Sequence, residues 1–128
     1  MEITNRAHGD TVVVSPTGRV DHATAANFER AVVPLLDATA GPRNGLVFDL
    51  ERVTYVSSVG LRVFMIASKS LRARGGRVAV AAMQPVVAEI LEICRFGAVV
   101  EIFPTVDAAL QAMAGAADPS RETPANKS

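Results

Sequence analysis

Residues 46–50 read Leu-Val-Phe-Asp-Leu, and they begin the stretch that decides the fold. The run is short, mostly apolar and partly β-branched, which is typical of a strand buried on both faces of a sheet. Residues 51–56, Glu-Arg-Val-Thr-Tyr-Val, are expected as a turn, and residues 57–60, Ser-Ser-Val-Gly, follow. Ser57 or Ser58 stands where the N-cap of a helix is expected, because a serine hydroxyl accepts a hydrogen bond from a free N–H of the first turn.

A long helix is predicted from Val59 onward. The residues expected on its buried face are spaced at i, i+3, i+4, i+7 and i+10, and they are Leu61, Phe64, Met65, Ser68 and Leu71. Gly75 and Gly76 end the helix, as glycine does just past a helix C-terminus. The stretch therefore places two serines at the mouth of a sheet and at the start of a helix, where open α/β sheets bind their ligands.

The residues before this stretch predict a hairpin. Residues 2–7 are expected as an edge strand, and Gly9-Asp10 as the turn into a second strand over residues 11–15. Pro16 either ends that second strand or lies at a sheet edge, because proline has no N–H to offer to a ladder.

Helices and strands alternate through the rest of the chain. A first helix is expected over residues 23–38, with Asp21 as its N-cap and Pro34 as an interior residue that kinks it or removes one backbone bond. Cys94 is expected on the buried apolar face of a later helix. Downstream of residue 76, two strands and two helices are expected in the order 77–81, 84–94, 99–103 and 104–114.

This alternation predicts an α/β fold with a mostly parallel sheet and an antiparallel hairpin at its start. We expect a mixed sheet of about 4–5 strands flanked by about 4 helices. The chain has 128 residues, which suits one domain, and we expect that domain to cover residues 1–114. Residues 115–128 have no apolar period and contain two prolines, so we expect a disordered tail there.

Composition argues against several classes of function. The chain carries 13 basic and 13 acidic residues, so its charge does not favour nucleic acid or an anionic membrane as a partner. It has no tryptophan, and no apolar run approaches the roughly 18–20 residues of a membrane span. The single cysteine, Cys94, makes no internal disulfide, and residues 1–6 lack the apolar core of a signal peptide, so we expect a cytoplasmic protein.

The serines lack the neighbours that catalysis needs. A nucleophile elbow reads Gly-x-Ser-x-Gly, and Val56 stands where its first glycine precedes Ser58. The chain has two histidines, His8 and His22, both upstream of the serines, and a serine without a base is a weak nucleophile. The sequence holds no glycine-rich phosphate motif and no metal-ligand spacing. We therefore expect no enzyme, no catalytic residue, no metal and no cofactor.

The central stretch resembles the signature of the STAS domain, the fold of bacterial anti-sigma factor antagonists. The resemblance rests on residues 47–50, Val-Phe-Asp-Leu, and on residues 53–62, Val-Thr-Tyr-Val-Ser-Ser-Val-Gly-Leu-Arg. It extends upstream to residues 18–21 and downstream to residues 75–78, and it covers roughly residues 2–114. It implies the same fold as the periodicity does: a mixed sheet with helices packed on it.

The resemblance also implies a small regulatory protein with a phosphorylatable serine. Ser58 falls on the phosphoacceptor position, and Ser57 is the less favoured acceptor. Ser57 stands where the best-known members carry aspartate, and Val59 stands where they carry a second hydroxyl residue. The residues alone favour Ser58 as a simple N-cap, whereas the resemblance favours it as the phosphoacceptor; if Ser57 is the cap, Ser58 is free to be modified.

The helix after the serines offers a candidate docking face with a basic rim around Met65 and Ile66, which suits an acidic partner. The alternative is that Met65 and Ile66 belong to the core and that the basic residues simply face solvent. By resemblance, the turn at Asp21 lies beside the serine loop and helps to form the partner surface. The partner-binding residues that we expect are Asp21, Ser57, Ser58, Val59, Gly60, Arg62, Met65, Ile66 and Lys69.

The first hypothesis for function, implied by the resemblance, is a cytoplasmic anti-sigma factor antagonist. Unphosphorylated, it would bind an anti-sigma factor with serine kinase activity and free a sigma factor; phosphorylation of Ser58 would break the complex and a serine phosphatase would reset it. The second hypothesis is a phosphorylation-independent STAS subunit of a larger assembly, such as a transport complex or a sensory scaffold. We expect a monomer or weak dimer that binds no nucleic acid and does not insert into a membrane.

Overall fold

The computed structural model describes residues 1–38 and 45–117. Within this part of the chain, strands and helices alternate as the sequence predicts. The strands are β1 (Glu2–His8), β2 (Thr11–Val20), β3 (Gly45–Asp49), β4 (Val53–Val56), β5 (Arg77–Ala81) and β6 (Glu101–Phe103). The helices are α1 (Ala25–Ala38), α2 (Ser58–Ala73), α3 (Pro85–Ile93), the short 3-10 helix η1 (Phe96–Ala98) and α4 (Val106–Ala117).

One mixed sheet organises these elements. Its strand order is β1-β2-β3-β5-β6, and β4 pairs with the far end of β2. β1 runs antiparallel to β2, and the other strand pairs are parallel. The α/β class, the parallel interior and the opening hairpin are confirmed; the sheet has six strands where about 4–5 were expected.

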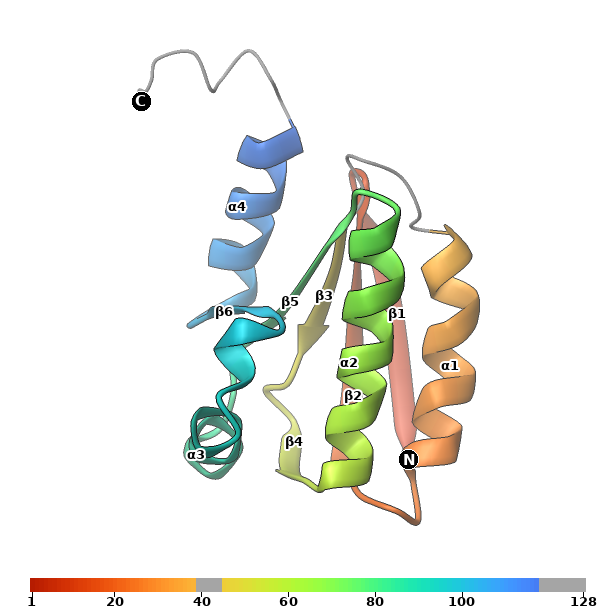
Figure 1. The fold of residues 1–128 in the computed structure, drawn as a ribbon, viewed down its shortest axis with the longest axis vertical. Helices are drawn as coiled ribbons and strands as arrows, with labels where there is room; N and C mark the ends of the chain where they lie inside the picture. The colour runs from red at the N-terminus through yellow and green to blue at the C-terminus, as the bar shows by residue number, and fades with distance from the viewer. Residues whose placement is uncertain (39–44, 118–128) are drawn as a thin grey trace.

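The sheet carries a hydrophobic layer on each face, because successive residues of a strand point to opposite sides. In β3, Leu46 and Phe48 join the larger layer beneath α1 and α2, whereas Val47 joins a smaller layer with Ala109 and Met113 of α4. Figure 1 shows α1 and α2 side by side across one face of the sheet. The prediction that residues 46–50 form a strand buried on both faces is confirmed.

Phenylalanine rings hold the larger layer together. Phe64 of α2 meets Phe28 of α1, Phe48 of β3 and Phe96 of η1 edge-to-face, with ring centroids 5.5, 4.8 and 6.1 Å apart. Such pairs add about 0.5–1.5 kcal/mol each beyond the burial of their area. Phe64 therefore fixes the position of α2 on the sheet, and with it the position of the two serines.

β2 is longer than the sequence indicates and runs through Pro16. Its parallel ladder with β3 ends at Val14, and its ladder with β4 begins at Gly18. Pro16 lies between these two ladders, so its missing N–H leaves no parallel ladder bond unmade. The segment expected as a turn, residues 51–56, contains β4, which exists because the far end of β2 is free to pair with it.

The expectation that Cys94 is buried is wrong, because the side chain is exposed. The buried positions of α3 are Val87 and Leu91, and a continuous helix would bring residue 94 to the same face. However, α3 ends at Ile93, and the chain turns away at Arg95, which has a left-handed φ of 54°. The helical periodicity therefore stops one residue before Cys94.

The remaining helices differ from expectation mainly at their ends. On the predicted buried face of α2, Met65 is exposed, whereas the other four residues are buried, namely Leu61, Phe64, Ser68 and Leu71. α1 begins at Ala25, two residues later than expected, and includes Pro34. α4 reaches Ala117, past the expected end of the domain, and residues 118–128 of the expected tail lie outside the described residues.

Candidate functional site

The two serines at the start of α2 have different environments. Ser57 is the N-cap: its backbone is extended, with φ −90° and ψ 175°, and its hydroxyl oxygen accepts a 3.3 Å hydrogen bond from the Gly60 N–H. Ser58 is the first residue of the helix, is exposed, and makes no side-chain hydrogen bond to any residue that the structure describes. The cap and the free hydroxyl are therefore on separate residues.

The start of α2 is held tightly against the end of β2. The Ser57 N–H donates a 2.8 Å hydrogen bond to the Val20 carbonyl oxygen. A Cβ at Gly60 would lie 2.6 Å from the same oxygen and 2.7 Å from the Val20 side chain, so the close approach requires glycine. This contact fixes the turn that follows β2, which begins with Asp21, beside the serines.

A polar cluster occupies that turn. Asp21 accepts hydrogen bonds from the Arg19 guanidinium, at 3.3 Å, and from the Ala23 N–H, at 3.0 Å. The Thr24 hydroxyl accepts from the Asp21 N–H at 3.0 Å, and the Arg19 guanidinium lies 4.5 Å from the centre of the Tyr55 ring in β4. Burial raises the pKa of Asp21, but the hydrogen bonds from Arg19 and the neighbouring turn outweigh it and hold that pKa below its ordinary value. The expectation that Asp21 is the N-cap of this helix is wrong, because α1 begins at Ala25 and its N-cap position is Thr24, three residues later. Asp21 instead organises the turn before α1.

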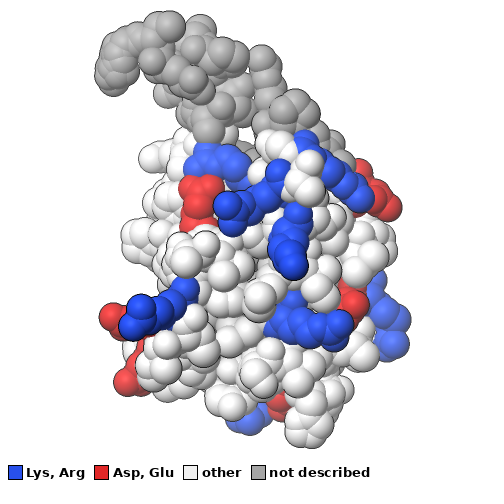
Figure 2. Space-filling view, viewed as in Figure 1, with Lys and Arg blue, Asp and Glu red and all other residues white. Residues whose placement is uncertain are grey.

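The exposed side of α2 combines basic and apolar residues. Val59 and Met65 are each 42% exposed, whereas Ile66 is half-buried and packs against the core. α2 contains no acidic residue, and Figure 2 shows basic side chains gathered over this face of the molecule. Such a surface suits an acidic partner with an apolar centre. We call these residues the α2 stripe: Ser58, Val59, Arg62, Met65, Lys69 and Arg72.

The fold brings the expected partner-binding residues to one region. Asp21 and residues 57–60 share one end of the sheet, and residues 62–69 extend from it along α2. Sequence reasoning missed Arg19 and Tyr55, which are cross-strand partners in the parallel register of β2 and β4. The contact between these two residues can be predicted only once β4 is known to pair with β2.

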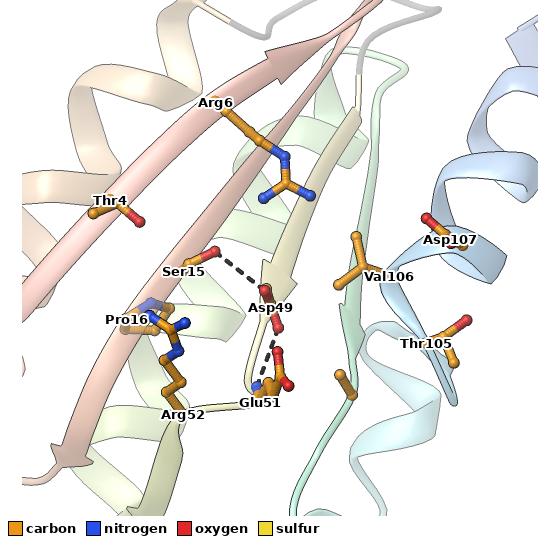
Figure 3. A pocket seen from close by; sticks show the side chains of 11 residues that line it. Thr4, Arg6, Ser15, Pro16, Asp49, Glu51, Arg52, Thr105, Val106 and Asp107 are labelled. Carbon is orange, nitrogen blue, oxygen red and sulfur yellow. Dashed lines mark hydrogen bonds between the residues drawn. The ribbon is translucent and has the colours of Figure 1, made fainter.

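A separate polar cavity of about 550 Å³ lies near the carboxyl ends of β3 and β5. Figure 3 shows Arg6 of β1 and Ser15 of β2 directed toward Asp49 of β3, with Asp107 of α4 across the cavity. Asp49 accepts hydrogen bonds from the Ser15 hydroxyl at 3.3 Å and from the Glu51 N–H at 3.1 Å. Among the described residues that line this cavity there is no histidine or cysteine, and the hydrogen-bond partner of the Ser15 hydroxyl is the Asp49 carboxylate.

Residues 1–38 and 45–117 offer little support for catalytic or metal chemistry at the serines. In that part of the chain, neither His8 nor His22 is hydrogen-bonded to Ser57 or Ser58, and no group of three or more acidic, histidine or cysteine side chains is placed to hold a metal ion. No helix within the described ranges is long and apolar enough to cross a membrane.

Comparison with known proteins supports the resemblance seen in the sequence. The family model for the STAS domain matches residues 2–109. BtrV of Bordetella bronchiseptica is 36% identical over 90 residues, which are 70% of this chain and 72% of BtrV. The crystal structure of an anti-sigma factor antagonist from Mycobacterium paratuberculosis is 28% identical, covers 88% of this chain and 93% of its own, and superposes with a TM-score of 0.78.

A more distant structure shares the fold. SpoIIAA, an anti-sigma factor antagonist from Bacillus, has been solved in unphosphorylated and phosphorylated forms. The unphosphorylated form is 18% identical, covers 89% of this chain and 97% of its own, and has a TM-score of 0.74. The family model spans almost the whole described domain, and the chain therefore belongs to the STAS domain family, related in sequence and structure to anti-sigma factor antagonists.

Proposed function

We propose that this protein is an anti-sigma factor antagonist whose binding is switched off by phosphorylation of Ser58. The observation that carries the proposal is the division of roles between the two serines. The Ser57 hydroxyl accepts the capping hydrogen bond from Gly60, whereas Ser58 is exposed and its hydroxyl has no partner in the described structure. Ser58 is thus the hydroxyl that a kinase reaches without uncapping α2.

A phosphoryl group on Ser58 is compatible with the fold. It adds about −1.5 to −2 charges near neutral pH. At a helix N-terminus, free N–H groups and the helix dipole favour negative charge, and Arg62 follows one turn later at i+4. The modification therefore leaves the interior unchanged and alters the surface at the end of the α2 stripe.

The partner that this surface fits is an anti-sigma factor with serine kinase activity. Its docking face would present acidic groups to Arg62 and Lys69, with an apolar contact to Met65. A phosphoserine at the edge of that contact brings negative charge against the partner's acidic groups. Binding becomes less favourable, because like charges repel each other where the interface excludes water. Release of the anti-sigma factor follows, and a serine phosphatase resets the protein.

A second candidate is a phosphorylation-independent STAS subunit of a larger assembly. It is favoured by Val59, an apolar residue that is 42% exposed directly beside Ser58. An apolar side chain there strengthens a permanent interface and supplies no second hydroxyl for a kinase.

The test is purification of the protein from its native cells, followed by intact-mass and site analysis of phosphorylation. The wild-type chain and Ser57→Ala are expected to carry one phosphoryl group on Ser58, and Ser58→Ala none. The captured anti-sigma factor, once identified, is then titrated with wild type, Ser58→Ala and Ser58→Glu. The switch predicts tight binding by the first two and at least about a tenfold loss for Ser58→Glu. Equal binding by all three, with no phosphate on Ser58, would establish the second candidate instead.

A further inference from the structure

A second surface lies at the β6 edge of the sheet. It adjoins the C-terminal end of the α2 stripe, where the Arg72 guanidinium donates a 3.4 Å hydrogen bond to the Val99 carbonyl oxygen just after η1. A groove of about 430 Å³ lies between α3, η1 and β6, and β6 is the last strand in the sheet order. Figure 1 shows these three elements together at that edge. Its apolar lining includes Met83, Leu91, Ala98 and Ile102, and its charged lining residues are Glu92 and Arg95.

Two large apolar side chains are exposed on the elements that border this groove. Ile93, the last residue of α3, is 73% exposed, and Ile102 of β6 is 41% exposed. Large apolar side chains that remain open to water favour an interaction surface, because covering them is favourable. Ile93 does not line the groove, but it follows Glu92 at the end of α3 and projects into solvent from the same helix.

The two charged residues of the groove make it complementary to itself. Glu92 and Arg95 carry opposite charges, and neither takes part in an ion pair within the described structure. Arg95 occupies the position just past the helix end with a left-handed φ of 54°, where glycine is ordinarily favoured. Arg95 therefore holds a backbone conformation at the groove that glycine would adopt with less strain.

We propose that this groove is the interface of a two-fold symmetric dimer of this chain. Ile93 of one protomer enters the groove of the other, and Glu92 of each protomer meets Arg95 of the other. A two-fold axis makes every contact twice, so one acidic and one basic residue suffice to pair both sides. The result is an apolar centre with a charged rim, which is the usual anatomy of an interface.

This inference does not depend on phosphorylation of Ser58. No residue of the groove belongs to the α2 stripe or to the Asp21 turn. A dimer of this kind carries two copies of the α2 stripe. A bivalent protein binds a dimeric or clustered partner more tightly than the single contact does, provided that both sites are reached together.

The first experiment is sedimentation of the full chain over a range of concentrations. The wild-type mass is expected to rise from the monomer value of 13.5 kDa toward twice that value. Ile93→Lys is expected to remain monomeric. The matched control is Val33→Lys, which alters another exposed apolar residue, on α1, and is expected to dimerise like wild type.

A charge-exchange experiment tests the geometry. Glu92→Arg and Arg95→Glu are each expected to weaken self-association at least about tenfold, because like charges then meet at both contacts. An equimolar mixture of the two variants is expected to regain the wild-type affinity, since the mixed dimer has opposite charges at both contacts. Thermal melting of each variant confirms that the fold is intact.

The native cysteine supplies an independent readout. Cys94 is exposed between Glu92 and Arg95 and is the chain's only cysteine, so a short bismaleimide can join two chains only through it. Wild type is expected to couple faster than a Cys94→Ser, Ala26→Cys chain, whose thiol lies on α1. A wild-type chain that stays monomeric at every concentration, a mixture that does not regain affinity, or equal coupling rates would each overturn the dimer and assign the groove to another occupant.

Discussion

The Ser57 N–H donates a 2.8 Å hydrogen bond to the Val20 carbonyl oxygen, and this bond joins the start of α2 to the end of β2. Both groups belong to the main chain, so no side-chain modification removes the connection. Asp21 follows Val20, and Ser58 follows Ser57. The two halves of the candidate partner surface are therefore held at a fixed separation whether or not Ser58 is phosphorylated.

The two adjacent serines are expected to differ in their contribution to stability. Ser57→Ala removes the oxygen that accepts the Gly60 N–H and is expected to lower the free energy of unfolding by about 1 kcal/mol, the usual cost of losing an N-cap. Ser58→Ala is expected to change it by less than about 0.5 kcal/mol, as for other surface substitutions. Urea denaturation of both variants measures the difference. Equal losses would mean that the capping role is shared.

The close approach at Gly60 predicts a large effect from one methyl group. Gly60→Ala places a Cβ 2.6 Å from the Val20 carbonyl oxygen, so the start of α2 must move, and we expect a loss of about 1–3 kcal/mol. Gly97→Ala is the matched control, because its Cβ would lie 3.7 Å from Ile102, an ordinary contact distance. Denaturation midpoints compare the two. A Gly60→Ala chain as stable as Gly97→Ala would show that the junction is loose.

The hydrogen bonds around Asp21 predict a specific dependence on pH. Its pKa is lower in the folded chain than in the unfolded chain, so the stabilisation is fully present above the ordinary aspartate pKa of about 3.9 and is lost as pH falls through the folded value. The Ala23 amide resonance, followed by NMR, is expected to titrate with a midpoint below that ordinary value. Asp21→Asn is expected to abolish this titration. A midpoint at or above the ordinary value would contradict the arrangement.

Two neighbouring residues of α2 are expected to differ sharply in their effect on folding. Phe64→Ala removes a fully buried ring that contacts three other rings, and we expect a loss of about 3–5 kcal/mol. Met65→Ala, at a side chain that is 42% exposed, is expected to cost less than about 1 kcal/mol. The same urea experiment measures both. A larger loss for Met65→Ala would place Met65 in the core and remove it from the α2 stripe.

Local patterns predicted most of the fold. The apolar run at residues 46–50, the helical spacing after Val59 and the Gly9-Asp10 turn each report a structure formed within a few residues, and each is confirmed. β4 was missed because its identity as a strand depends on β2, more than thirty residues away. Cys94 was misplaced because periodicity gives the face of a residue while a helix continues, and α3 ends one residue too early.

The candidate site was predictable in part for the same reason. Two serines before an apolar-periodic run indicate a helix start, but sequence alone does not say which hydroxyl caps it. That choice depends on backbone angles at the junction with Val20. Arg19 and Tyr55 were missed because their contact is cross-strand, and the strand pair that creates it was not expected.

The stacking of Arg19 on Tyr55 also gives this protein an optical signal of its own. Tyr55 is the chain's only tyrosine, and the chain has no tryptophan. Tyrosine emission of the unlabelled protein therefore comes from one ring, which lies beneath a guanidinium at the edge of the candidate partner surface. A tryptophan-free ligand that displaces Arg19 from the ring would change that emission, so docking at this end of the molecule can be followed without attaching a dye.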